Sequence, residues 1–221
     1  MKIQITSDNS HTLFSTKAQQ TYHSTEGAVM ESKHVYISPA FSHFPDKSEI
    51  KILEVGFGTG LNAILTLLEA QQENKTIFYE TIEPDPIPEI IYKQLNYPAN
   101  LSCSKDLFLE LHEANPENPL YLSNFHFIKR YTTVTDYTSN QLFDVIYFDA
   151  FSPDAQPEMW SINIFYKMYE LLSPGGILLT YSAKGVVKKA LRQAGFQIKR
   201  LPGAGSKHHM LKAEKVIPAN S

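Results

Sequence analysis

One short segment constrains this chain more than any other: an apolar run that breaks into three glycines at alternate positions, residues 52–61 (ILEVGFGTGL). The run predicts a strand, the glycines predict a loop, and the apolar residues behind them predict a helix. Open α/β sheets build sites for nucleotide-like ligands from this succession. Gly56, Gly58 and Gly60 let the backbone approach a ligand closely and adopt conformations that a Cβ forbids. The segment therefore predicts a cofactor site at residues 54–60.

The chain from residue 50 onward alternates between strand and helix patterns. The run 143–149 is almost wholly apolar, as is typical of a central parallel strand. Such alternation predicts an α/β fold with a Rossmann-like, mostly parallel sheet, right-handed crossovers and helices on both faces. We expect strands over 51–55, 76–82, 125–129, 143–149, 177–181 and 196–201, with 208–213 as a seventh, and helices over 61–72, 86–96, 106–114, 158–172 (ended by Ser-Pro-Gly-Gly at 173–176) and 186–194.

Residues 1–49 lack this alternation. Short strand-like pieces at 3–6, 13–15 and 34–37 are separated by polar, turn-like sequence. They predict a β-rich N-terminal extension, packed on a main domain that spans residues 50–221.

Composition narrows the class of protein. Cys103 is the single cysteine among 221 residues, which excludes an intrachain disulfide and a cysteine-based metal cluster and fits a reducing cytoplasm. No apolar run reaches the roughly 20 residues that span a bilayer, and the start of the chain lacks a signal-peptide pattern. Nine of the 20 basic residues but one of the 23 acids lie from Lys184 onward, so this segment carries +8 and the remainder −11. The segment predicts either a surface for an anionic partner such as RNA or a solvated face.

The spacing of the glycines indicates which cofactor is bound. A dinucleotide fingerprint, G-x-G-x-x-G, requires glycine at position 61, where this chain has Leu61, and a phosphate P-loop is excluded because no Gly-Lys-Ser/Thr follows. The observed G-x-G-x-G, preceded by Glu54, resembles the first motif of class I S-adenosylmethionine (SAM) methyltransferases. Glu83 ends the second strand, where a carboxylate can accept hydrogen bonds from both ribose hydroxyls. For Glu54, a structural role beneath the loop is as good an explanation as ligand contact.

The chemistry is expected just beyond the fourth strand, at Asp149-Ala150-Phe151-Ser152-Pro153. Ligands of open α/β sheets bind at the carboxyl ends of the strands, so Asp149 should lie beside the cofactor. We expect its carboxylate to bind and orient an amine and to take or relay the amine's proton. Phe151 and Trp160 either stack a flat base or pack within the protein. His208 and His209 have no third ligand at metal spacing, so we predict no metal site.

These motifs resemble a known family. Residues 54–62, 148–153 with 157–160, 174–176 and 203–207 are similar to the MnmC methyltransferase domain, and Tyr22-His23-Ser24, Glu31 and Val35-Tyr36 are similar to its N-terminal extension. That family methylates the aminomethyl group on wobble uridine 34 of certain tRNAs, giving 5-methylaminomethyl-2-thiouridine. The resemblance implies a class I SAM-dependent methyltransferase fold, SAM as the cofactor and tRNA as the partner.

The resemblance also implies roles for matching residues. Asp149 would face the aminomethyl group, with Phe151 and Pro153 as walls of the pocket. The SAM site would comprise Glu54, Gly56, Phe57, Gly58, Gly60, Asn62 and Glu83. Lys207 would lie in a late, tRNA-facing loop; we add Trp160, for base stacking, and the basic Lys188 and Lys189 to the predicted tRNA site.

Two departures from the family bear on function. Fused members carry an FAD-dependent oxidase domain that removes a carboxymethyl group. This chain ends at Ser221, so we expect it only to methylate and to rely on other enzymes for the 5-aminomethyl intermediate. A Gly-Asp pair, whose acid contacts adenine in the family, is replaced by Lys129-Arg130-Tyr131-Thr132, which leaves the adenine contact open.

Other functions stay open at this point. A polyamine aminopropyltransferase or a small-molecule N-methyltransferase shares the fold and an acid near Asp149, but a polyamine site should have more acids in the substrate loop than Asp154. A non-catalytic SAM- or tRNA-binding module would lack a pocket carboxylate. Leu61 disfavours a dinucleotide oxidoreductase.

Overall fold

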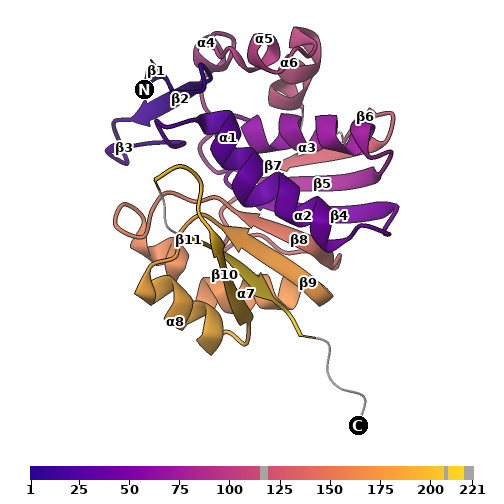
Figure 1. The fold of residues 1–221 in the computed structure, drawn as a ribbon, viewed down its shortest axis with the longest axis vertical. Coiled ribbons are helices and arrows are strands. Elements are labelled where there is room, and N and C mark those ends of the chain that lie inside the picture. The colour runs from indigo at the N-terminus through magenta and orange to yellow at the C-terminus, as the bar shows by residue number, and fades with distance from the viewer. Residues whose placement is uncertain (115–118, 207–208, 217–221) are drawn as a thin grey trace.

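The computed structural model describes residues 1–114, 119–206 and 209–216. Across these residues, eight strands form one central sheet in the order β10-β11-β9-β8-β4-β5-β7-β6 (Figure 1). Strands β9, β8, β4, β5 and β7 run parallel, whereas β10, β11 and β6 pair antiparallel with their neighbours. The strands are β4 Glu49–Val55, β5 Thr76–Ile82, β6 Leu120–Leu122, β7 Phe125–Arg130, β8 Phe143–Phe148, β9 Leu172–Thr180, β10 Gln197–Pro202 and β11 His209–Glu214.

The direction in which strands are added reverses at β4. The chain runs outward from β4 through β5 to β7, then returns to place β8 and β9 on the other side of β4. In open α/β sheets the ligand crevice lies at such a point. Val55 pairs in register with Phe148, and the Asp149 N–H donates to the Val55 carbonyl at 3.0 Å. The glycine loop after β4 and the Asp149 segment after β8 therefore leave the sheet side by side.

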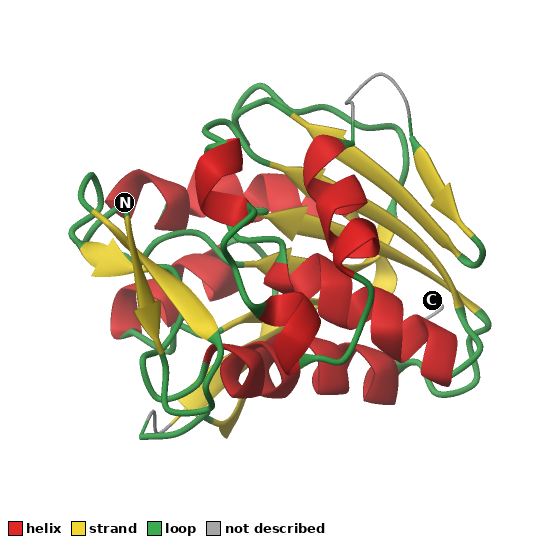
Figure 2. Cartoon of the chain, turned by 90° about the horizontal axis from the view of Figure 1, so that it is seen from above, coloured by secondary structure: helices red, strands yellow, loops and turns green. Residues whose placement is uncertain are grey.

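Helices cover both faces of the sheet, as Figures 1 and 2 show, which confirms the predicted α/β class. One face packs against the N-terminal helices together with α3 and α6, and the other packs against α7 and α8. Every residue of β8 is buried, as its apolar sequence predicts for a central strand. The helices after β4 are α3 Leu61–Gln72, α4 Glu89–Tyr92, α5 Tyr97–Asn100, α6 Lys105–Glu113, the 3-10 turn η2 Pro157–Trp160, α7 Ile162–Leu171 and α8 Gly185–Gln193.

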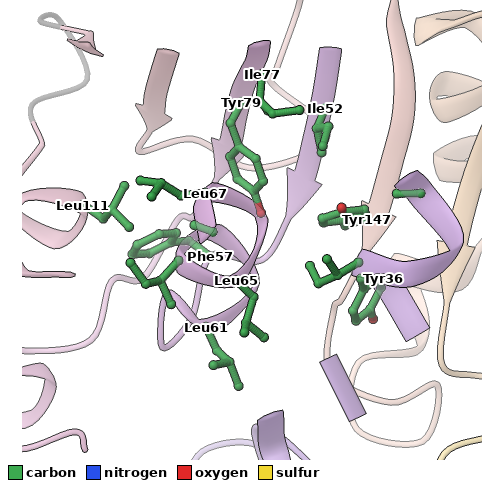
Figure 3. Packing of buried hydrophobic residues seen from close by; sticks show 14 of the residues in the cluster. Tyr36, Ile52, Phe57, Leu61, Leu65, Leu67, Ile77, Tyr79, Leu111 and Tyr147 are labelled. Carbon is green, nitrogen blue, oxygen red and sulfur yellow. The ribbon is translucent and has the colours of Figure 1, made fainter. Parts of the chain in front are cut away.

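Aromatic side chains fill much of the core on the α3 face. Tyr79 of β5 and Tyr147 of β8 lie there with Phe57 and with leucines of α3 (Figure 3). Tyr36, from the N-terminal extension, packs its ring 5.3 Å from that of Tyr147. The extension and the main sheet therefore share one hydrophobic core.

The N-terminal extension is part sheet and part helix. Strands β1 Lys2–Ile5, β2 His11–Ser15 and β3 Gln20–Thr21 form a small antiparallel sheet. A continuous helical stretch follows, made of α1 Ala28–Ser32, the π-helical turn η1 Lys33–Ile37 and α2 Ser38–His43. The strand predicted at 34–37 is therefore wrong, whereas the three-stranded sheet supports the predicted β structure of the extension.

The physical reason is packing. The run HVYI is rich in β-branched and aromatic residues, but such propensity is weak against tertiary context. Buried positions along this stretch include Ala28, Glu31, Ser32, Val35 and Tyr36, which recur at helical spacing. The division into residues 1–49 and 50–221 stays a prediction.

Other local predictions need correction. The sheet has eight described strands where seven were expected, because β6 is too short to show an alternating pattern. The helix expected over 158–172 is interrupted at Ser161, whose hydroxyl caps α7. The helix ends at Leu171, just before the Ser-Pro-Gly-Gly segment at 173–176, but that segment already lies within β9, which begins earlier than the predicted strand at 177. The helix expected over 86–96 begins only after Pro88 and is short.

Candidate active site

The glycine loop leaves β4 in a conformation that only glycine adopts readily. Gly56 has φ +93°, and a Cβ there would lie 2.9 Å from the Asp149 carbonyl oxygen. Its N–H donates to the Ile82 carbonyl at 3.0 Å, which fixes the start of the loop to the end of β5. Gly60 has φ +74° and begins α3. The loop is thus held by backbone bonds and close backbone contacts.

Glu83 supports the loop from the end of β5. Its carboxylate accepts the Gly58 N–H and the Asp85 N–H, each at 2.9 Å. Burial raises the pKa of Glu83, and these two backbone donors oppose the rise because they stabilise the carboxylate. The acid predicted to bind ribose therefore also orders the glycine loop.

Asp149 is oriented by two side chains from distant parts of the chain. The Tyr36 hydroxyl donates to Oδ1 at 2.7 Å, and Asn62 Nδ2 donates to Oδ2 at 2.8 Å. Burial, followed by the Asp149 charge, raises the pKa of Tyr36 well above its ordinary value, so the phenol stays a donor at neutral pH. The carboxylate is consequently fixed on both oxygens.

Glu54 lies beneath the loop, fully buried, outside the residues that line the cavity described below. Thr81 Oγ1 donates to its Oε2 at 2.9 Å. Burial raises the pKa of Glu54 to about 8, against the opposing effect of the Thr81 hydrogen bond. Of the two explanations for this acid, the position favours the structural one.

A cavity of about 830 Å³ lies between the glycine loop, the Asp149 segment and the N-terminal extension. Phe151 meets Tyr22 of the extension edge to face, with the ring centroids 5.0 Å apart, and the Tyr181 hydroxyl donates to the Ala150 carbonyl at 2.9 Å. Predicted residues that line this cavity are Gly56, Phe57, Gly58, Asn62, Glu83, Asp149 and Phe151. The glycine cradle, the strand-end acid and the cavity's size fit SAM.

Several predicted residues lie elsewhere. Trp160 is 4% exposed and packs against Phe148, while its indole N–H donates to the Phe151 carbonyl at 2.8 Å. It is packed in the protein rather than placed to stack a base. Pro153 is buried behind the cavity wall, and Gly60 lies at the start of α3 outside the lining.

The residues predicted to contact tRNA through charge cannot all be placed. Lys188 and Lys189 lie on α8, half-buried and exposed respectively. The N-terminus of this helix is close to the cavity rim, because Lys184 pairs with Asp154 in the loop after β8. Lys207, like His208, lies outside the described residues.

Several cavity residues come from outside the two motifs, and the sequence pattern indicates no role for them. They include Tyr22 and Glu31 of the extension and Tyr181 after β9, while Tyr36 acts on the cavity through Asp149. The helical spacing of buried residues in the extension was the signal that could have placed Glu31 and Tyr36 on the inner face.

The segment after β7, where the adenine contact was left open, lies only partly at the cavity. Residues 133–135, after β7, line the cavity, whereas Tyr131 is 47% exposed and lies outside the lining. Its ring lies 5.4 Å from Lys129 Nζ. Lys129 itself is buried and donates to the carbonyls of Leu111 and His112 behind the loop.

The described residues hold neither a candidate metal site nor a helix that could cross a membrane. No group of three His, Cys, Asp or Glu side chains there is arranged to hold a metal ion. Within the same residues, no helix combines the length and apolar character needed to cross a bilayer.

Comparison with known proteins agrees with this geometry. Residues 125–216 match a family described as S-adenosyl-L-methionine-dependent methyltransferase. The tRNA 5-methylaminomethyl-2-thiouridine biosynthesis bifunctional protein MnmC of Cupriavidus necator is 29% identical over 214 residues, covering 89% of this chain and 32% of that protein. The chain thus spans about a third of the length of the curated relatives it matches.

Solved structures share the fold. The crystal structure of MnmC2 from Aquifex aeolicus matches with a TM-score of 0.82 at 22% identity, over 98% of this chain and 70% of that chain. SAM-bound CalS10, an amino pentose methyltransferase, matches with a TM-score of 0.52 at 12% identity, over 86% of this chain and 92% of that chain. This chain is thus similar to an S-adenosyl-L-methionine-dependent methyltransferase family over residues 125–216 and to the MnmC proteins over most of its length, and it shares the fold of the MnmC2 structure.

Proposed function

We propose that this protein methylates the 5-aminomethyl group of (2-thio)uridine at wobble position 34 of tRNA, giving 5-methylaminomethyl-2-thiouridine. The observation that carries the proposal is the Asp149 carboxylate, which Tyr36 and Asn62 hold in the cavity that the glycine loop also lines. The name of the Cupriavidus necator relative supports tRNA as the substrate.

The chain's own residues mainly position the reactants. When bound, SAM supplies an activated methyl group and leaves as S-adenosylhomocysteine. Gly56 and Gly58 would hold it against the loop, and Glu83 would accept hydrogen bonds from its ribose. Asp149 would bind the substrate ammonium and take one proton, which leaves a neutral nitrogen with a free lone pair. Phe151, edge-on to Tyr22, would form one wall for the uracil ring.

Charge around the cavity supports an amine substrate. Acids from separate elements line it: Glu31, Glu83, Asp85, Asp149 and Glu158. Such a lining favours a cation over a neutral hydroxyl acceptor. It also favours a second candidate, transfer to a free polyamine or other small amine, because acids beyond the substrate loop now contribute to the pocket.

The test uses purified protein and SAM with a labelled methyl group. We expect label in tRNA that carries 5-aminomethyl-2-thiouridine and none in matched tRNA with unmodified uridine at that position. Nucleoside analysis of the product identifies the methylated base. If the modified tRNA gains no label while a free diamine does, the tRNA proposal is wrong and the second candidate holds.

The basic face offers an independent test of tRNA binding. Replacing Lys188 and Lys189 on α8 by Glu should weaken tRNA binding and flatten its dependence on salt, because each phosphate contact contributes roughly 0.7–0.9 to the slope of log K against log salt. Lys105→Glu, an exposed change on α6, is the control. If the slope of log K against log salt is unchanged in the Lys188/Lys189 variant, this face is solvent-exposed and does not bind tRNA.

The proposal has consequences in the cell. The 5-aminomethyl group must be installed by other enzymes or by a domain outside this chain, so this protein would act after them. A tRNA substrate also favours a cytoplasmic location. In cells lacking the protein, we expect the 5-aminomethyl nucleoside to accumulate in tRNA at the expense of its methylated product.

A further inference from the structure

His112 is a buried histidine of α6 that lies behind the glycine loop, outside the lining of the cavity. Its Nε2 lies 3.1 Å from the carbonyl oxygen of Thr59, which precedes it by 53 positions in the chain. A carbonyl oxygen only accepts hydrogen bonds, so Nε2 carries the hydrogen and is the donor. Thr59 lines the cavity beside Gly58, so this bond fixes a backbone group of the loop that is proposed to hold SAM.

The imidazole also contacts the loop on both sides of Thr59. Phe57 meets it edge to face, with the ring centroids 5.0 Å apart. On the other side, the ring approaches Gly60 so closely that a Cβ there would lie 2.9 Å from Nε2. Residues 57–60 therefore rest on one side chain that neither sequence motif contains.

The position of His112 is itself fixed by its surroundings. Its ring stacks on that of Tyr92 from α4, with the centroids 4.3 Å apart and an interplanar angle of 12°. The buried Lys129 ammonium donates to the carbonyls of Leu111 and His112 in the last turn of α6, which lack partners within the helix. The end of α6 is thus tied to β7, and the imidazole is held against the loop.

The imidazole is neutral. Burial, followed by the charge of Lys129, lowers the pKa of His112 to about 3. A neutral ring has a single N–H, and the Thr59 carbonyl places it on Nε2. The donor is therefore present over the whole physiological pH range.

Thr59 is held through its side chain as well. The Tyr97 hydroxyl of α5 lies 3.1 Å from Thr59 Oγ1 and 2.8 Å from the His11 carbonyl oxygen of β2. The helices between β5 and β7 thus contact both polar groups of this residue, the carbonyl through α6 and the hydroxyl through α5.

We infer that His112 is a positioning residue for SAM: it holds the Thr59 carbonyl, and with it loop residues 57–60, in the conformation that receives the cofactor. The inference rests on the SAM site of the proposed function and not on tRNA as the methyl acceptor. A loop that is ordered in advance loses little conformational entropy when its ligand binds, so the affinity is higher. Helices α4–α6 then tune the affinity for SAM from behind the loop.

The decisive comparison is His112→Leu with His112→Gln. Leucine fills much of the space without a donor, whereas the glutamine amide can still donate to the Thr59 carbonyl. We expect His112→Leu to raise the calorimetric Kd for SAM about fivefold to tenfold, as for one lost hydrogen bond, and His112→Gln to stay within about twofold of wild type. The kcat at saturating SAM and the KM for the methyl acceptor should not change, because Asp149 is oriented by Tyr36 and Asn62.

His43→Leu is the matched control. His43 lies half-buried on α2, outside the cavity lining, and its Nε2 is 3.2 Å from the Gly175 carbonyl oxygen. The change removes the same kind of bond at a distance from the loop, so the Kd for SAM should equal that of wild type.

Two results would overturn the inference. A wild-type Kd for SAM in His112→Leu would mean that the loop does not depend on this bond, and equal weakening in the Leu and Gln variants would mean that the ring only fills space. If His112→Leu does not fold, His112→Asn replaces it: its amide is one carbon shorter and should not reach Thr59, so a Kd equal to that of His112→Gln contradicts the inference. If the protein binds SAM but does not methylate tRNA, the proposed function fails, and the Kd values still decide the role of His112.

Discussion

The two halves of the cavity are built in different ways. The half that we propose for the cofactor is formed mainly by the glycine loop, whose backbone N–H groups hold it: Gly56 donates to the Ile82 carbonyl, and Gly58 donates to the Glu83 carboxylate. The half that we propose for the methyl acceptor is assembled from side chains far apart in the chain. Asp149 is bonded to Tyr36 across 113 positions and to Asn62 across 87.

This difference reflects two requirements: SAM binding, which is general to the fold, and recognition of one substrate, which is specific. Any protein that binds SAM in this fold needs a loop that a nucleoside can approach, and glycine meets that need locally. The acceptor half must match one substrate, so it recruits side chains from wherever the fold brings them. Variants should therefore fail differently in the two halves.

Gly56→Ala should have the largest effect because it damages both halves. The new Cβ would lie 2.9 Å from the Asp149 carbonyl oxygen at a backbone φ of +93°. We expect loss of SAM binding by calorimetry and of all turnover, with a stability cost of about 1–3 kcal/mol from backbone strain.

Gly185→Ala is the control for that change. Gly185 begins α8, and a Cβ there meets nothing within 4 Å. It should bind SAM normally and gain about 0.4–1 kcal/mol of stability, since alanine restricts the unfolded chain. Normal SAM binding by Gly56→Ala would show that the loop tolerates a side chain.

Asp149→Asn should affect the acceptor half alone. The amide keeps the shape of the side chain but cannot take the amine's proton. We expect kcat to fall by roughly 10²–10⁴-fold, the range for loss of a general acid–base group, while the Kd for SAM changes little. Single-turnover methylation of the tRNA measures the first quantity. Wild-type kcat would remove Asp149 from the mechanism.

Tyr36→Phe should have a smaller effect because Asn62 still holds the other carboxylate oxygen. Phenylalanine fills the same buried space, so folding should change little. The loss of one oriented hydrogen bond, worth about 1 kcal/mol, should lower kcat by a factor of roughly five to ten. Equal kcat in both proteins would mean that Asn62 alone suffices to orient Asp149.

Glu54→Gln should have the smallest effect on turnover and a distinct effect on stability. Burial raises the pKa of Glu54 from 4.5 to about 8 in the folded protein, so the native state keeps its proton over that range while the unfolded chain does not. The stability that protonated Glu54 contributes is fully present below pH 4.5, its pKa in the unfolded chain, and is lost as the pH rises toward 8.

Glutamine cannot ionise, so the unfolding free energy of the variant does not fall with pH through this group. The difference in unfolding free energy should shift in favour of Glu54→Gln by about 1 kcal/mol per pH unit over this interval. Urea unfolding of both proteins at several pH values provides the measurement. Parallel pH profiles would mean that Glu54 is ionised in the fold.

The same contrast explains what could be predicted from the sequence. The glycine loop, Glu83 and Asp149 follow from local pattern, because each ends a strand whose apolar run is visible. The two explanations for Trp160 could not be separated, because an aromatic residue after an active-site loop gives the same sequence pattern whether it faces a base or the core. Its indole bond to the Phe151 carbonyl is a tertiary fact.

Glu31 and Tyr36 could be matched to the family's N-terminal extension, but the position of Glu31 in the cavity wall and the bond from Tyr36 to Asp149 could not be predicted. The HVYI run at 34–37 has strand propensity, and only packing on the main sheet makes it helical. A strand at 34–37 would place different side chains toward the sheet, so the inward face of the extension could not be predicted. The short edge strand β6 could not be predicted, because three residues are too few to show an alternating pattern.

The π-helical turn Lys33–Ile37 bears on how such proteins can diverge. Wider turns of this kind arise within α-helices and are frequent at functional sites. Deleting one residue before Tyr36 would rotate the phenol by about 100° around the helix axis and release Asp149, while α1 and the small sheet could keep their contacts. A single codon lost or gained here would thus alter substrate orientation without disturbing the glycine loop, a step that methyl transfer measured beside SAM affinity would reveal.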